Sequence, residues 1–135
     1  MNEASPSTDD RESAYALLQR GQALIRRRHH AQAAIVLERA ARLEPGKGSI
    51  LEPLGRAYHL SRQYEPARET FERLLDVDPS AHWAHFALAA SLRKLDRLAE
   101  ARTHLRLAVA LSPGSELYRR ALAALEAATR TSDAA

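Results

Sequence analysis

Cysteine is absent from the chain of 135 residues, which excludes disulfide bonds, thiolate metal sites and a cysteine nucleophile. Aromatic residues are scarce, with one Trp, two Phe and four Tyr, so the regularly placed base-stacking residues of an RNA reader are missing. Five Gly and six Pro are too few for the many tight turns of an all-β sandwich. No run approaches 18 consecutive apolar residues, so we predict no membrane insertion.

The first ten residues are polar and acidic, and they lack the basic and apolar regions of a secretory signal. We therefore expect a cytoplasmic protein. The chain has 18 Arg but only two Lys and one Asn, a composition typical of proteins encoded by GC-rich bacterial genomes. On this basis we expect a bacterial source.

The composition favours helices, because the chain holds 27 Ala and 20 Leu, which are strong helix formers. With 45% hydrophobic residues, the chain is too apolar to be disordered throughout. The formal net charge of +3 is unevenly distributed: residues 1–12 carry −3, whereas residues 13–130 carry +7. We expect a basic folded body with a disordered acidic tail at 1–11 and a second disordered tail at 131–135.

Three prolines, Pro45, Pro79 and Pro113, stand 34 residues apart, and other positions repeat at the same spacing. A small residue once per unit lets two helices approach closely, and apolar residues at helical spacing give each helix one buried stripe. The chain is therefore expected to form three helical hairpins followed by one more helix. The matching sets are Gly21, Gly55 and Ala89; Ala33, Ala67 and Ala101; and Leu37, Phe71 and Leu105.

The middle unit reads Leu51-Glu52-Pro53-Leu54-Gly55-Arg56-Ala57-Tyr58 and continues with Ala67, Phe71 and Pro79, which resembles the tetratricopeptide repeat (TPR). The resemblance implies an all-α fold, a right-handed superhelical stack of hairpins (a TPR solenoid) with seven helices. It implies a single domain over 12–130, with repeats at 14–47, 48–81 and 82–115 and a capping helix at 116–130. The expected helices span residues 12–27, 30–43, 49–60, 65–77, 82–94, 98–111 and 116–130.

Several residues carry more local expectations. Arg119 and Glu126 stand where a further repeat would have apolar residues, so the last helix is interpreted as a cap that ends the array. Ser115 is expected to cap the N-terminus of that helix. Pro53 is expected to loosen the start of its helix, because proline lacks an N–H group. His85 replaces a large apolar residue of the family pattern, and we expect it to be partly buried.

In the tetratricopeptide family the inner, concave groove is lined mainly by the first helix of each repeat. Trp83, the only Trp, falls on this surface, and Trp is enriched in binding hot spots. Alternatively, Trp83 packs on the adjacent first helix and covers the core. The groove residues implied by the resemblance are Tyr15, Leu18, Gln22 and Ile25 in repeat one, Ser49, Glu52, Arg56 and His59 in repeat two, and Trp83, Phe86, Ala90, Arg93 and the rim residue Lys94 in repeat three.

A complete repeat array with a cap and no catalytic constellation favours a non-catalytic scaffold or adaptor. Such a protein would bind a peptide segment or helix of a partner protein in the concave groove. Arg56, Arg93 and Lys94 would pair with carboxylates, so we expect an acidic or carboxylate-bearing partner. The acidic tail at 1–11 is hypothesised to screen this groove loosely.

One subgroup of the family clamps the C-terminal carboxylate of Hsp70 and Hsp90 chaperones with Lys, Asn, Asn, Lys and Arg at fixed groove positions. None of these residues is present at the corresponding positions here, so binding of a chaperone tail is disfavoured. The five positions hold Leu18, Gln22, Pro53, Trp83 and Ala87.

The motifs of catalysis and cofactor binding are missing. His82 and His85 share a helix face but have no nearby carboxylate, so they make an incomplete metal site. Gly46-Lys47-Gly48-Ser49 resembles the end of a phosphate-binding loop, but the pattern requires an earlier Gly where Ala41 stands, and a preceding strand. We predict no catalytic residues, no cofactor and no metal, and interpret the segment as a turn in which Gly46 ends one helix and Ser49 caps the next.

Two other functions remain open. Tyr15, Leu18 and Ile25 would form an exposed apolar patch on repeat one that a homodimer could bury. The basic run from Arg26 to His30 would bind RNA or DNA, although nucleic acid is the less favoured partner because aromatic residues are few.

Overall fold

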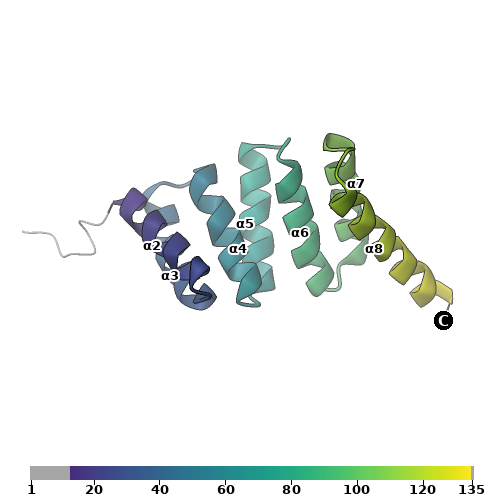
Figure 1. The fold of residues 1–135 in the computed structure, drawn as a ribbon, viewed down its shortest axis with the longest axis horizontal. Coiled ribbons are helices and arrows are strands. Elements are labelled where there is room, and N and C mark those ends of the chain that lie inside the picture. Colours follow the sequence, from purple (N-terminus) through teal and green to yellow (C-terminus); the bar gives the residue numbers. More distant parts are fainter. Residues whose placement is uncertain (1–12, 135) are drawn as a thin grey trace, which may run out of the picture.

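The computed structural model describes residues 13–134, and all seven expected helices are present there (Figure 1). The predicted acidic tail at 1–11 lies outside the described residues. No described residue belongs to a strand, and no described helix is long and apolar enough to cross a membrane. The helices are α2 (Ala14–Arg26), α3 (His30–Leu43), α4 (Gly48–Leu60), α5 (Tyr64–Val77), α6 (His82–Lys94), α7 (Leu98–Leu111) and α8 (Glu116–Ala134).

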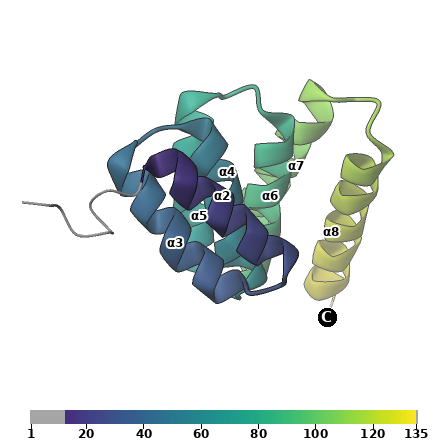
Figure 2. The ribbon, with the colours of Figure 1, turned by 60° about the vertical axis from the view of Figure 1, so that its left-hand side comes forward.

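The helices form three hairpins that stack in sequence order into a right-handed superhelix, with α8 at one end (Figures 1 and 2). The first helices of consecutive repeats lie against each other, α2 on α4 and α4 on α6. The Tyr58 hydroxyl of α4 donates a hydrogen bond to the Glu38 carboxylate of α3 and so ties repeats one and two together. A continuous core of Leu and Ala side chains runs through the stack.

The repeated small residues are required for close packing within the first two hairpins. A Cβ atom on Gly21 would lie 2.5 Å from the Leu37 side chain, and one on Gly55 would lie 2.6 Å from the Phe71 ring. These distances are well inside van der Waals contact, so the two helices of each hairpin could not pack this closely around a larger residue. The predicted role of the 34-residue pattern in helix approach is therefore confirmed.

The turn inside each hairpin places a non-glycine residue in the left-handed region: Arg28, Arg62 and Asp96 have φ values of 64°, 65° and 62°. In the middle hairpin the Arg62 N–H donates to the His59 carbonyl at 3.0 Å, and the next N–H donates to the Tyr58 carbonyl at 2.8 Å. This bond pair is the Schellman arrangement that ends a helix. The sequence pattern did not predict it, because no glycine marks these turns.

Three local expectations about helix termini and Pro53 had different outcomes. Ser115 caps α8 as predicted, because its hydroxyl accepts a hydrogen bond from the Tyr118 N–H at 3.2 Å. The prediction that Ser49 caps α4 is wrong, since the helix begins at Gly48 with Lys47 as its N-cap residue. Pro53 lies buried inside α4, which remains helical to Leu60.

The predicted C-terminal tail at 131–135 is wrong for residues 131–134, because α8 continues to Ala134. Nothing between Glu116 and Ala134 interrupts the helix, since the segment has no Gly or Pro and is rich in Ala. The hydroxyls of Thr129 and Thr131 donate back to the carbonyls of Leu125 and Ala127, one turn earlier in the helix.

Candidate functional site

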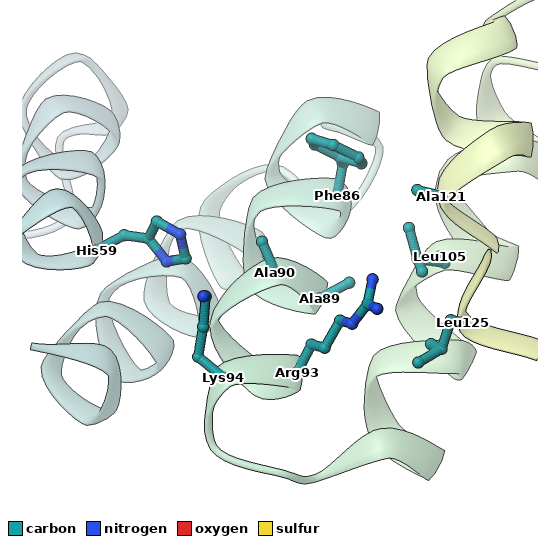
Figure 3. Close-up of a pocket in the computed structure, with 9 residues that line it drawn as sticks. All are labelled: His59, Phe86, Ala89, Ala90, Arg93, Lys94, Leu105, Ala121 and Leu125. Atoms are coloured by element: carbon teal, nitrogen blue, oxygen red, sulfur yellow. The ribbon is translucent and has the colours of Figure 1, made fainter. Parts of the chain in front are cut away.

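A pocket of about 560 Å³ opens between α6 and α8 and extends to α4 (Figure 3). Its apolar wall comes from three helices, and its charged edge comes from the last turn of α6. The lining residues are His59 of α4, Phe86, Ala89, Ala90, Arg93 and Lys94 of α6, Leu105 of α7, and Ala121 and Leu125 of α8.

The pocket exists because α8 does not continue the packing of the earlier repeats. The helix α8 packs against α7. Among the described residues, α8 does not lie against α6 as closely as α6 lies against α4. Several of the residues that line the resulting cleft are small, with Ala89 and Ala90 on α6 and Ala121 on α8. The space that larger side chains would have filled therefore remains open.

Two cations at the pocket have no ionic partner in the part of the chain that the structure describes. Arg93 and Lys94 are exposed, and neither makes an ion pair with any residue that the structure describes. None of the nine lining residues is acidic. By contrast, Arg56 on the neighbouring first helix lies 3.5 Å from the Glu52 carboxylate. The positive potential of the groove is therefore concentrated at the end of α6.

His59 forms the α4 side of the pocket as a half-buried side chain. Its Nδ1 atom is hydrogen-bonded to the Ser91 hydroxyl at 3.0 Å, and the edge of its ring meets Tyr64 with centroids 5.2 Å apart. Burial lowers the pKa of His59, and the nearby charge of Lys94 lowers it further. His59 is therefore neutral at neutral pH and leaves the two cations as the charges of the site.

Tyr118 holds α8 against α6 at the far end of the pocket. Its hydroxyl is hydrogen-bonded to His82 Nδ1 at 2.8 Å, and its ring stacks on Phe86 with centroids 5.1 Å apart. At the other end Leu125 is fully buried, and an Arg106–Glu126 ion pair of 3.2 Å joins α7 to α8. The cleft lies between these two attachments.

The structure brings together four of the predicted partner-binding residues, His59, Phe86, Arg93 and Lys94, together with Ala90. The others lie elsewhere. Tyr15, Leu18 and Ser49 line a second, smaller pocket between α2 and α4. Gln22 and Ile25 are half-buried on α2, and Glu52 and Arg56 pair with each other. Trp83 is 37% exposed on α6 and lines neither pocket.

The sequence analysis did not predict the other half of the pocket wall, which consists of Ala89, Leu105, Ala121 and Leu125. The family pattern places mainly first-helix residues in the groove, and none of these four residues was among the groove positions that it implied. The small residue at Ala121, between Tyr118 and Leu125 on one helix face, is the available signal that the cap leaves a gap.

His82, His85 and His104 make hydrogen bonds within the stack. His82 is hydrogen-bonded to Tyr118. His85 was expected to be partly buried, and it is buried. Its Nε2 donates to the Pro79 carbonyl at 3.0 Å, and its Nδ1 lies 3.0 Å from Nδ1 of His104. No group of three His, Asp or Glu side chains suited to a metal ion occurs among the described residues. The site offers apolar contact and two cations.

A comparison with protein families identifies the repeat. The tetratricopeptide repeat model matches residues 52–116, which cover most of the second hairpin and all of the third. The match identifies tetratricopeptide repeats in this part of the chain, and the seven observed helices are consistent with three repeats and a C-terminal capping helix. No curated protein matches the chain significantly.

Solved structures show the same fold at low sequence identity. The first TPR of Spaghetti (RPAP3) bound to an HSP90 peptide is 16% identical, with a TM-score of 0.82 over 87% of this chain and 94% of that one. The Sgt2 TPR domain from Aspergillus fumigatus is 19% identical, with a TM-score of 0.82 over 97% and 89%. MamA from Desulfovibrio magneticus RS-1 is 20% identical, with a TM-score of 0.85 over 90% and 68%.

Proposed function

We propose that this protein is a non-catalytic adaptor of the cytoplasm that binds an acidic segment of a partner protein at its concave groove. The tetratricopeptide fold is that of a protein–protein interaction scaffold. The observation that carries the acidic character of the partner is a pair of cations beside an apolar pocket, Arg93 and Lys94, which make no ion pair with residues 13–134. The excess of basic residues in the folded body, +7 over residues 13–130, favours approach of the same kind of partner.

A chaperone tail is not the partner that we propose. The neighbour RPAP3 was solved with an HSP90 peptide, but this chain has none of the clamp residues of the chaperone-binding subgroup. Two of the five clamp positions here are occupied by Pro53, which is buried inside α4, and by Trp83. The cations lie instead at the C-terminal end of α6, so the carboxylate would be bound at a different place.

The test is capture of partners from a native lysate with the wild-type chain and with the double variant Arg93→Glu/Lys94→Glu. The matched control is Arg27→Glu, an exposed position at the α2–α3 turn. We expect the double variant to lose proteins that the wild type and the control both retain. Capture of the same proteins at the same level by all three chains would show that the groove is not the binding surface.

Self-association is the second candidate, and the exposure of Tyr15 (69%) favours it. The predicted patch is smaller than expected, because Leu18 and Ile25 are partly buried against the core. A monomer mass in light scattering at high protein concentration would exclude self-association.

The nucleic-acid alternative rests on the exposed Arg26, Arg27 and Arg28 side chains. Failure to retain RNA or DNA at low salt would exclude it.

A further inference from the structure

We propose that the cleft between α6 and α8 is the specificity site of this adaptor. It takes one bulky apolar side chain from an extended segment of the partner, while Arg93 and Lys94 bind carboxylates on either side of that side chain. The capping helix α8 is thus part of the recognition surface as well as a cover for the core. This inference rests on the proposed function and names the segment that the groove recognises.

The size of the cleft suits one anchor side chain. A cavity of about 560 Å³ has room for a single large side chain together with the backbone that carries it. The small side chain of Ala90 and the burial of Ala89 leave room for that backbone to cross α6.

The wall of the cleft is suited to an apolar anchor. Phe86 of α6 and Ala121 of α8 face the space from two sides, and the buried side chains of Leu105 and Leu125 close its floor (Figure 3). Phe86 is held by its stack on Tyr118, so the wall is already formed in the free protein. Insertion of an apolar side chain would remove this surface from water without a rearrangement of the core.

The two cations define the flanking residues of the segment. In Figure 3 the Arg93 side chain extends toward α8, whereas the Lys94 side chain extends toward His59. Carboxylates bound by the two cations would therefore lie on opposite sides of the anchor side chain. An acidic residue on each side of the apolar anchor matches this arrangement, and a basic segment would be repelled.

The experiment is selection of binders from a random 12-residue peptide display library on the full chain, followed by affinity measurement with synthetic selected peptides. Five variants are compared with the wild type. Ala121→Leu fills the cleft from α8, and Ala90→Leu fills it from α6. Ala123→Leu is the control for Ala121→Leu, because it adds the same side chain on the exposed face of α8. Arg93→Glu/Lys94→Glu reverses the charge of the two cations. Arg27→Glu serves as the charge control, and thermal unfolding of each variant verifies that it is folded.

We expect selected peptides to share a bulky apolar residue flanked by Asp or Glu. Their affinity should fall at least about tenfold in Ala121→Leu and Ala90→Leu, which corresponds to the loss of about 1.4 kcal/mol. Affinity should stay within about twofold of wild type in Ala123→Leu and Arg27→Glu. A second selection on Arg93→Glu/Lys94→Glu should enrich Lys or Arg in place of the acidic residues.

The failures of the two proposals are distinguishable. Peptides that bind wild type, Ala121→Leu and Ala90→Leu equally would overturn the cleft assignment and leave the adaptor function standing. Selected peptides without acidic residues would overturn the role of the two cations. If no peptide is enriched and lysate capture also shows no dependence on Arg93 and Lys94, both proposals fall.

Discussion

Gly55 shows how the size of one residue determines the distance between two helices. It lies in the middle of α4, where an added Cβ atom would come within 2.6 Å of the Phe71 ring on α5. Gly48 on the same helix has room, since its added Cβ atom would lie 3.5 Å from Leu74 Cδ1, an ordinary contact distance. The two glycines are therefore a matched pair for testing close packing.

We predict that Gly55→Ala lowers the free energy of unfolding by about 1–2 kcal/mol, because the cost of overpacking exceeds the gain in helix propensity. Gly48→Ala should be neutral or should raise it by up to about 1 kcal/mol, because Ala restricts the unfolded chain. Urea unfolding of the two variants and the wild type measures both values. An equal effect of the two substitutions would contradict the packing argument.

The capping helix α8 is attached differently from the other elements. Every other helix packs on its hairpin partner and on at least one helix outside its own repeat, whereas α8 packs mainly on α7. Its contact with α6 depends on Tyr118, which bonds His82 and stacks on Phe86. In a stack where each unit contacts only its neighbours, loss of such a contact acts locally.

We predict that Tyr118→Ala releases α8 without unfolding the first two repeats. Removal of a buried aromatic side chain costs about 3–5 kcal/mol, and most of this loss should appear at the C-terminal end of the stack. Tyr118→Phe keeps the stack on Phe86 and loses only one hydrogen bond, worth about 0.5–1.5 kcal/mol. Hydrogen exchange should show lost protection in α8 of Tyr118→Ala, with α2 to α5 protected as in wild type. Equal loss of protection in all helices would show that the stack unfolds as one unit.

Over the whole molecule, half-buried histidines make stability depend on pH. Burial lowers the pKa of His104, and the charge of the adjacent His85 lowers it further, although Glu72 and Glu100 act in the opposite direction. Burial and Lys94 lower the pKa of His59. In the unfolded chain both groups titrate near their ordinary value of about 6.5. Below that pH the unfolded state binds more protons than the folded state, so acid favours unfolding.

We therefore predict that the free energy of unfolding is lower at pH 5.5 than at pH 7.5, and that the double variant His59→Gln/His104→Gln reduces this difference. Urea unfolding at both pH values provides the measurement. His29→Gln, a substitution at an exposed position in the α2–α3 turn, is the control and should leave the difference unchanged. A pH difference of the same size in wild type and in the double variant would assign the effect to other groups.

Much of the architecture could be predicted because it depends on periodic, local features. The spacing of Pro45, Pro79 and Pro113 and the recurrence of a small residue at Gly21, Gly55 and Ala89 indicated the three hairpins. Six helices within the repeats were expected to within two residues of their observed ends. The last helix was expected to end four residues too early, since no repeat-related signal marks its C-terminus.

Only the part of the candidate site that lies on the first helices of the repeats could be predicted from the sequence. His59, Phe86, Arg93 and Lys94 occupy groove positions that follow from register in the first helices. Ala121 and Leu125 join them because α8 diverges from α6, and that divergence depends on how Tyr118 and Leu125 pack against the end of the stack. Periodicity in a sequence encodes which helix face is buried. The gap between α6 and α8, and the cations beside it that have no ionic partner within residues 13–134, result from packing between segments distant in the chain.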